Sequence, residues 1–300
     1  MTSAGDTDFA GVAIVTGANS GLGFETARRL AAQTREATVI LACRNPQKGA
    51  EAELSIREST GNVRVKALPL DLSSLASVRA FAAEFATSAG VPIDSLVCNA
   101  GISRASGPTA DGFDPVFETN HLGHFLLTLL LLPRMSPTGR IISVSSDMHQ
   151  PPGPALTWPG ADAVAIVQRP AKRRLRYSYS KLCNLYFTYA LTRRLEAEHS
   201  TVSAAAFNPG LMTDTGFATI PAPVGAVMKK IFASRVGDLE TSSTALARLA
   251  SGASGARIGG QYFDRTDRMP SRSSALSYDV ENARELWQVS ARLVGETAAG

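Results

Sequence analysis

The sequence predicts an α/β protein in which a mostly parallel, seven-stranded sheet carries helices on both faces. Two observations lead to this fold class. Short apolar runs alternate with helical patterns over the first two thirds of the 300 residues, which is typical of a parallel sheet covered on both sides. No linker, repeat or low-complexity tract interrupts them, so we expect a single doubly wound domain that spans residues 1–300.

The predicted elements follow one another in a regular order. Each strand is an apolar run bounded by turn residues, and the strands are 11–17, 37–44, 63–71, 93–101, 140–146, 202–210 and 259–264. Each helix is a longer segment of helical character, and the helices are 22–33, 46–59, 74–88, 111–135 and 178–198. The apolar run His124–Pro133 is too short to span a bilayer, so we expect a buried helix there.

Two segments break this rhythm. The first, 147–176, holds five prolines, which prevent a regular helix or a central strand and predict a long functional insert. The second, 213–238, is apolar and basic, and we expect it to form a lid over the substrate. Apolar residues of both segments, Trp158 among them, could line a pocket for a bulky substrate. The alternative is that they pack against the domain or a partner subunit.

The composition limits the classes of partner. A net charge of +4 is mild, and we expect the densest basic run, 171–181, to be a solvated loop rather than a nucleic-acid site. The three cysteines and four histidines show no disulfide or metal-ligand spacing, and nothing resembles a leader peptide. We therefore expect a cytoplasmic protein with no metal, no nucleic-acid partner and no stable membrane insertion. Peripheral membrane contact through 226–235 is an alternative.

A glycine-rich turn follows the first predicted strand and opens the first helix. Its sequence is VTGANSGLG, with glycines 17, 21 and 23. Side chains at these positions would keep the backbone from a pyrophosphate, and a helix N-terminus favours negative charge. The predicted cofactor contacts in this turn are Gly17, Asn19, Ser20, Gly21, Leu22 and Gly23.

The end of the second strand carries an arginine where a carboxylate is expected in NAD-binding proteins. The sequence there is LACRN, with Arg44 in the position that contacts the ribose. No acid is present to repel a 2′-phosphate, and a guanidinium is present to bind one. We therefore predict NADP(H) rather than NAD(H). A surface arginine at a strand end is the alternative.

Three further strand ends should meet at the same edge of the sheet. Asp71 could accept a hydrogen bond from an adenine amino group, and Gly101 lets the chain pass close to a ribose. The remaining predicted cofactor contacts at these ends are Leu72, Asn99, Ala100, Pro209, Gly210 and Thr213.

A phenol and an amine share one face of the last long helix before the sixth strand. Tyr177 and Lys181 are four residues apart, and a nearby ammonium favours the phenolate and lowers its pKa. Ser146 ends the fifth strand and could hold a carbonyl oxygen, while Asn120 could bind a water that relays protons towards the lysine. Tyr179 is the rival phenol, but it has no lysine four residues later.

In this order, TGANSGLG, CNAG, Asn120, Ser146, the Tyr-x3-Lys motif and NPG resemble the short-chain dehydrogenase/reductase family over nearly the whole chain. The resemblance implies a Rossmann domain, hydride transfer between a nicotinamide and a carbonyl carbon, and Tyr177 as the general acid or base. Lys181 would also bind the nicotinamide ribose. The resemblance also implies a homodimer or homotetramer formed through the helices 111–135 and 178–198.

Two branches of this family look similar to the chain. Segments such as TNHLGHFLLT and the tail GGQYFD…ARELWQVSARLVGE resemble retinol dehydrogenase-like enzymes. LACRN, LDLSSLASVRAF and SKLCN are shared with the light-dependent protochlorophyllide reductases, which carry a cysteine after the Pro-Gly pair and a threonine at the serine position. This chain has Leu211 and Ser146 instead, which puts photochemistry in doubt.

The sequence therefore predicts an NADP(H)-dependent alcohol/carbonyl oxidoreductase acting on a bulky, mostly apolar small molecule. Two alternatives differ in their chemistry. One is the C=C reduction of a tetrapyrrole, and the other is a non-catalytic NADP(H)-binding sensor. The complete set of serine, tyrosine, lysine and asparagine argues against the sensor.

Overall fold

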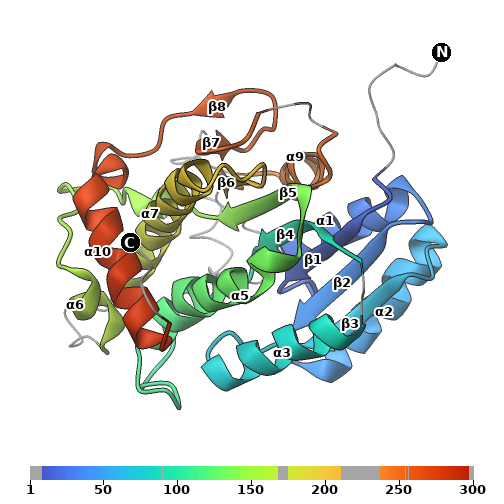
Figure 1. Ribbon diagram of the computed structural model, residues 1–300, viewed down its shortest axis with the longest axis horizontal. Helices are drawn as coiled ribbons and strands as arrows, with labels where there is room; N and C mark the ends of the chain where they lie inside the picture. Colours follow the sequence, from blue (N-terminus) through green and yellow to red (C-terminus); the bar gives the residue numbers. More distant parts are fainter. Residues whose placement is uncertain are drawn as a thin grey trace, which may run out of the picture.

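The computed structural model describes residues 9–88, 91–167, 175–210, 237–253, 255 and 257–296. Its core is one sheet with the strand order β3-β2-β1-β4-β5-β6-β7-β8 (Figure 1). The strands are β1 (Val12–Thr16), β2 (Thr38–Cys43), β3 (Val65–Pro69), β4 (Ile93–Cys98), β5 (Met135–Val144), β6 (Ser203–Asn208), β7 (Gln261–Asp264) and β8 (Pro270–Ser271). The first seven are parallel, and the order reverses beside β1, which defines a doubly wound sheet.

The sheet has eight strands rather than the seven that the sequence predicted. The extra strand, β8, is two residues long and pairs antiparallel with β7 at the edge of the sheet. It carries Pro270, which an edge strand tolerates because the missing N–H can face away from its neighbour. So short a strand leaves no period of two in the sequence.

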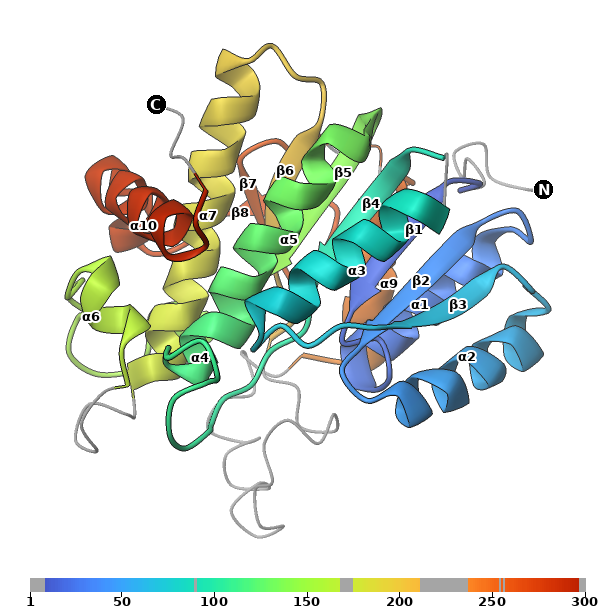
Figure 2. The same cartoon turned by 60° about the horizontal axis from the view of Figure 1, so that its bottom comes forward.

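Helices cover both faces of this sheet (Figure 2). They are α1 (Gly21–Gln33), α2 (Pro46–Thr60), α3 (Leu75–Ser88), α4 (Pro115–Phe117), α5 (Gly123–Leu131), α6 (Ala161–Ala165), α7 (Arg176–Ala197), α9 (Leu239–Ser251) and α10 (Val280–Leu293). Successive residues of β1 point to opposite sides, so that Ile14 joins the core under α3, α5 and α7 and Val15 joins the core under α1, α2 and α9. The predicted helices are therefore confirmed, except the fourth.

The predicted helix 111–135 is broken into pieces. Asp114 caps α4, because its Oδ1 accepts from the N–H groups of Val116 and Phe117. Pro115 then occupies the first helical position, so the helix begins four residues later than predicted. A π turn, Glu118–Leu122, follows before α5 begins, and β5 already starts at Met135. Single π turns inside helices are frequent at functional sites.

The Pro-rich insert 147–176 folds partly onto the protein itself. The indole Nε1 of Trp158 donates a 2.7 Å hydrogen bond to Glu285 on α10, and its ring meets the edge of Tyr186 with centroids 5.1 Å apart. Of the two roles that the sequence left open for Trp158, packing against the domain is the one observed. The lid predicted at 213–238 falls almost entirely outside the described residues. Its last residue, Asp238, caps α9.

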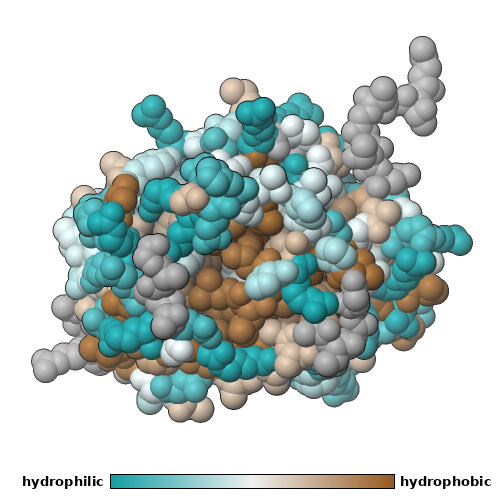
Figure 3. Space-filling model, viewed as in Figure 1, coloured by the Kyte–Doolittle hydropathy of each residue, from teal (hydrophilic) through white to brown (hydrophobic). Residues whose placement is uncertain are grey.

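The C-terminal helix α10 packs across α5 and α7. The ring of Trp287 stacks on Phe187 and meets the edge of Phe125, with centroids 6.0 and 5.0 Å apart, and Arg194 lies 4.2 Å over the indole. The family resemblance implies self-association through the predicted helices 111–135 and 178–198, which correspond here to α5 and α7. The helix α10 of the same chain covers part of both. Apolar side chains remain visible over α5 (Figure 3), where Leu129 is partly buried.

Among the helices within the described ranges, none combines the length and the apolar character needed to cross a lipid bilayer.

Candidate active site

The carboxyl ends of β1, β4, β5 and β6 meet at one edge of the sheet, and the predicted site residues follow these ends. The glycine turn follows β1, Asn99–Gly101 follows β4, Ser146 lies two residues after β5, and Pro209 directly follows β6. Since β1 and β4 are neighbours at the point where the strand order reverses, the crevice between their ends is where doubly wound sheets bind ligands.

The glycine turn is shaped for close packing. Gly17 has a φ of 65°, Gly21 a φ of 56°, and the N–H of Gly17 donates to Ala42 on β2. A Cβ added to Gly23 would lie 2.6 Å from the carbonyl oxygen of Gly17 and 2.4 Å from Nδ2 of Asn99. The third glycine therefore lets α1 pack directly against the turn.

The N-terminus of α1 fits a pyrophosphate. Ser20 precedes the helix and makes no side-chain capping bond, and the first turn of the helix holds no acidic residue. The N–H groups and the positive end of the helix dipole are then available to an anion. This part of the chain is consistent with a nucleotide cofactor.

Arg44 and Cys43 at the end of β2 point in different directions. The Arg44 side chain is exposed, where it could meet a phosphate, whereas Cys43 is buried beneath the glycine turn. Burial raises the pKa of the Cys43 thiol to about 11, and hydrogen bonds from the backbone of Ala18 and Asn19 act in the opposite direction.

Asp71 and Leu72 occupy different environments at the end of β3. Oδ1 of Asp71 accepts from the N–H and the hydroxyl of Ser73, at 2.9 and 2.6 Å, which fixes the turn. Leu72 is buried in the core, where an added Cβ at Gly123 would lie 2.4 Å from its carbonyl oxygen. The predicted cofactor contact of Leu72 could therefore come only from its backbone.

Thr16 holds the turn after β4 against β1, and sequence reasoning missed it. Its Oγ1 accepts from the N–H groups of Asn99 and Ala100, both at 2.9 Å, and its carbonyl oxygen accepts from Nδ2 of Asn99. Thr16 is fully buried. A hydroxyl that ends an otherwise apolar strand was the available signal, because a buried hydroxyl needs hydrogen-bond partners.

Asn120, in the π turn, clamps the chain that follows Gly101. Its Nδ2 donates to the carbonyl oxygen of Ile102 and to Oγ of Ser180, both at 2.9 Å, and its Oδ1 accepts from the N–H of Ile102 at 2.7 Å. Both amide hydrogens are thus used inside the protein. The predicted water of a proton relay would have to bind the backbone or the remaining lone pair of Oδ1.

Lys181 is buried close to Gly101. Its Nζ donates a 2.9 Å hydrogen bond to the carbonyl oxygen of Val144 and lies 5.6 Å from the ring centroid of Tyr177. A Cβ added to Gly101 would lie 3.6 Å from this Nζ, an ordinary contact, but only 3.1 Å from Oδ1 of Asn120, so the glycine leaves room for Asn120. Burial lowers the pKa of Lys181 to about 8.

The pKa of Tyr177 differs from the prediction. Burial raises it to about 12, and a hydrogen bond with the side chain of Ser146 acts to lower it. The lowering by Lys181 that the sequence predicted is not seen in this structure, because the loss of hydration dominates and the Lys181 ammonium donates to the carbonyl oxygen of Val144. The hydrogen bond does bring the side chains of Tyr177 and Ser146 together.

The NPG turn after β6 is tied to the segment that follows Ser146. Nδ2 of Asn208 donates to Oδ1 of Asp147 at 2.7 Å, and its Oδ1 accepts from the N–H of Gly210 at 3.0 Å. Pro209 accepts from the hydroxyl of Ser242 on α9. Thr213 and Leu211 lie outside the described residues.

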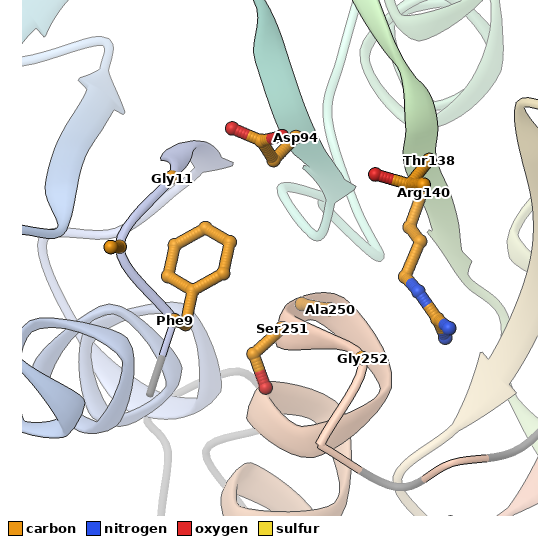
Figure 4. Close-up of a pocket in the computed structure, with 9 residues that line it drawn as sticks. Phe9, Gly11, Asp94, Thr138, Arg140, Ala250, Ser251 and Gly252 are labelled. Carbon is orange, nitrogen blue, oxygen red and sulfur yellow. The ribbon is translucent and has the colours of Figure 1, made fainter. Parts of the chain in front are cut away.

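A pocket of about 310 Å³ lies at the opposite edge of the sheet, among the amino ends of β1, β4 and β5 (Figure 4). Its charged residues hold elements together. Asp94 accepts from the N–H of Val12, and Arg140 donates to the carbonyl oxygen of Leu249 near the end of α9. None of the predicted site residues lines it. In the described part of the chain, no three His, Cys, Asp or Glu side chains gather as a metal ion would need.

Comparisons with known proteins agree with this architecture. The WW domain-containing oxidoreductase of Danio rerio is 38% identical over 302 residues, covering 95% of this chain and 68% of that protein. Human retinol dehydrogenase 13 is 38% identical over 289 residues, covering 94% and 84%. A solved structure of an uncharacterized protein from Mycobacterium Paratuberculosis has a TM-score of 0.71 and 32% identity, covering 98% and 96%.

The family model described as "short chain dehydrogenase" matches residues 11–161, from the start of β1 to the start of α6. The match includes the glycine turn, Asn120 and Ser146. Together with the relatives, it shows that this chain belongs to the short-chain dehydrogenase family of oxidoreductases.

Proposed function

We propose that this protein is an NADP(H)-dependent oxidoreductase that interconverts an alcohol and a carbonyl group on a bulky, mostly apolar small molecule. The observation that carries the proposal is the hydrogen bond between Tyr177 and Ser146, with the Lys181 amine one helical turn away. The glycine turn and Arg44 would hold the cofactor. When bound, the nicotinamide would supply or accept the hydride.

Tyr177 would move the proton. In reduction, the neutral phenol gives its proton to the carbonyl oxygen, and in oxidation the phenolate takes it from the alcohol. The raised pKa of Tyr177, about 12, keeps the phenol neutral, which is the form that reduction needs. Ser146 would hold the same substrate oxygen through its hydroxyl, so that donor and acceptor stay within hydrogen-bond distance.

Lys181 would make this proton transfer easier in the loaded enzyme. An ammonium close to the phenol stabilises the charge that remains on Tyr177 after it gives up its proton. Asn120 would hold the segment after Gly101 through its two hydrogen bonds to the backbone of Ile102, next to the Lys181 amine. These roles assign each of the four predicted catalytic residues a distinct task.

The preference for an apolar substrate rests on two supports. Retinol dehydrogenase 13, a relative with 38% identity, is named for an alcohol of this kind. Apolar residues are also abundant in the segment 213–238. Trp158 no longer supports a large pocket, because it packs against α10 and Tyr186.

The test of the chemistry compares two phenols of the same helix. NADPH consumption is measured with a panel of apolar aldehydes and ketones, retinaldehyde included, for the wild type, Tyr177→Phe and the matched control Tyr179→Phe. Loss of the proton donor should lower kcat by about 10²- to 10⁴-fold in the first variant, while the control stays within about twofold. Undiminished turnover in Tyr177→Phe would refute the assigned donor.

The test of the cofactor uses two cations near the end of β2. Removing the guanidinium in Arg44→Ala should raise the Kd for NADPH about tenfold or more and leave the Kd for NADH unchanged. Lys48→Ala, an exposed residue on α2, is the control and should change neither value. Equal affinity of the wild type for NADPH and NADH would contradict the preference.

The remaining alternatives have their own outcomes. A wild type that binds NADPH but is silent across the carbonyl panel would favour the sensor. Bound pigment that is converted only on illumination would favour C=C reduction. A cytoplasmic location and self-association are further expectations, which fractionation and light scattering can test.

A further inference from the structure

The hydroxyl of Thr16 is saturated by its neighbours. A hydroxyl has one hydrogen and two acceptor lone pairs. Two N–H groups, those of Asn99 and Ala100, already occupy the lone pairs at 2.9 Å each. The hydrogen must therefore point to a remaining neighbour, which is either Nε2 of His124 at 2.9 Å or the carbonyl oxygen of Val97 at 3.3 Å. The imidazole nitrogen is the closer acceptor.

The other side of the imidazole leads to the same tautomer. Nδ1 of His124 lies 3.2 Å from the carbonyl oxygen of Asn120, which can only accept. Nδ1 must then carry the hydrogen, and Nε2 must be the acceptor that faces Thr16. The reverse tautomer would place two lone pairs against each other at Asn120 and a third donor on Thr16. Burial lowers the pKa of His124 to about 4, in keeping with a neutral ring.

His124 thus joins the two halves of the candidate site. On one side it contacts Thr16, which holds the turn at Asn99 and Ala100 beside the glycine turn. On the other side it contacts the backbone of Asn120, whose side chain clamps the chain after Gly101. The ring is buried on α5, so water cannot replace these bonds without opening the core.

We propose that His124 is a positioning residue, held as the neutral Nδ1–H tautomer, that couples the nucleotide-binding turn after β4 to the carbonyl oxygen of Asn120. This inference rests on the proposed function, because the coupling matters only if the nucleotide and Asn120 serve one reaction. His124 donates to one lone pair of this carbonyl oxygen, and a relay water would use the other.

The direct test is the tautomer itself. In protein labelled with ¹⁵N in its histidines, ¹⁵N chemical shifts distinguish a protonated Nδ1 from a protonated Nε2, and the His124→Gln spectrum assigns the signal. We expect His124 to show a protonated Nδ1 and a bare Nε2 at neutral pH, while the exposed His199 serves as an internal reference. A protonated Nε2, in a neutral or charged ring, would overturn the proposal. This readout needs no turnover, so its result is separate from the test of the proposed function.

Two variants each keep one of the two hydrogen bonds that His124 makes with Asn120 and Thr16. In His124→Asn, the amide nitrogen can replace Nδ1 as donor to Asn120, but the contact with Thr16 is lost. In His124→Gln, the amide oxygen can replace Nε2 as acceptor from Thr16, but the contact with Asn120 is lost. The first should raise the Kd for NADPH roughly three- to tenfold with kcat nearly unchanged, and the second should lower kcat by a similar factor with Kd nearly unchanged.

His199→Gln is the control and should leave both constants unchanged. Equal losses of affinity and turnover in both His124 variants would mean that the ring only fills space, which would overturn the positioning role. If both variants fail to fold, the tautomer measurement on the wild type still decides the proposal. If the wild type binds NADPH but turns over no carbonyl compound, the proposed function fails, and the tautomer and the Kd values still test the nucleotide side of the coupling.

Discussion

The candidate site has a nucleotide half, made of the glycine turn and Arg44, and a catalytic half, made of Asn120, Ser146, Tyr177 and Lys181. The two halves are built by opposite means. Around β1, the fit depends on atoms that are absent, since a Cβ at Gly23 would collide with the backbone of Gly17. Between α5 and α7, it depends on polar atoms that are present and buried, such as those of Asn120 and Lys181. Adding atoms should therefore damage the first half, whereas removing atoms should damage the second.

The two halves also differ in their electrostatics. The nucleotide half offers backbone N–H groups and the exposed guanidinium of Arg44. The catalytic half contains buried titratable groups, and burial has moved the pKa of Tyr177 to about 12 and that of Lys181 to about 8. Sensitivity to pH should therefore originate in the catalytic half.

The largest effect should come from removing the buried amine. Lys181→Met keeps the length and the apolar stem of the side chain but deletes the charge that stabilises the phenolate. We expect kcat to fall by about 10²- to 10⁴-fold, measured with the best substrate of the carbonyl panel. Lys48→Met, on the surface of α2, is the control. Full activity in Lys181→Met would contradict the expectation that the catalytic half depends on its buried polar atoms.

The next effect should come from adding one methyl group in the nucleotide half. Gly23→Ala forces the added Cβ against the carbonyl oxygen of Gly17, a backbone atom that cannot rotate away. We expect a Kd for NADPH at least about tenfold higher, by fluorescence titration, and a lower Tm. The matched control is Gly259→Ala, where nothing lies within 4 Å of the added atom. Unchanged binding in Gly23→Ala would show that the turn can adapt.

The pH dependence should identify the catalytic half as the titrating one. Because burial lowers the pKa of Lys181 to about 8, the free enzyme loses the ammonium above that pH. We expect kcat/KM for carbonyl reduction to be flat below about pH 8 and to fall about tenfold per pH unit above it. The Kd for NADPH should change less over the same range. A profile that is flat to pH 10 would exclude control by this amine.

The smallest effect is on stability. Glu118 is fully buried in the π turn, and burial raises its pKa from 4.5 to about 8, with the charges of Asp111 and Asp71 adding to the rise. A carboxyl group with a raised folded-state pKa favours folding at low pH, and that stability is lost as the pH rises from 4.5 through 8.

Glu118→Gln should therefore be more stable than the wild type at pH 8, by about 1 to 3 kcal/mol, and equally stable at pH 4.5. Urea unfolding at the two pH values measures the difference. A variant that is less stable at pH 8 would show that Glu118 is ionised and stabilised by its surroundings.

Local patterns in the sequence predicted much of the fold and of the site. The strands, the glycine turn and the spacing of Tyr177 and Lys181 are each visible within a few neighbouring residues, because period and spacing are local properties. Residues at the ends of parallel strands then meet at one edge, so the convergence of the strand ends also followed from the fold class.

The remaining features depend on contacts between distant segments. The position of Trp158 depends on its hydrogen bond to Glu285, which lies 127 residues further along the chain. The bridge through Thr16 and His124 joins residues that are 108 positions apart. The raised pKa of Tyr177 depends on how deeply the folded protein buries it, which spacing alone does not report.

The most direct test is a crystal structure of the protein with NADP(H) and an unreactive carbonyl analogue. We expect the hydroxyl groups of Tyr177 and Ser146 to lie roughly 2.6–3.2 Å from the same analogue oxygen, with the nicotinamide ring against the analogue's carbonyl carbon. A nicotinamide bound elsewhere, or a Tyr177 hydroxyl turned away from the analogue, would contradict it.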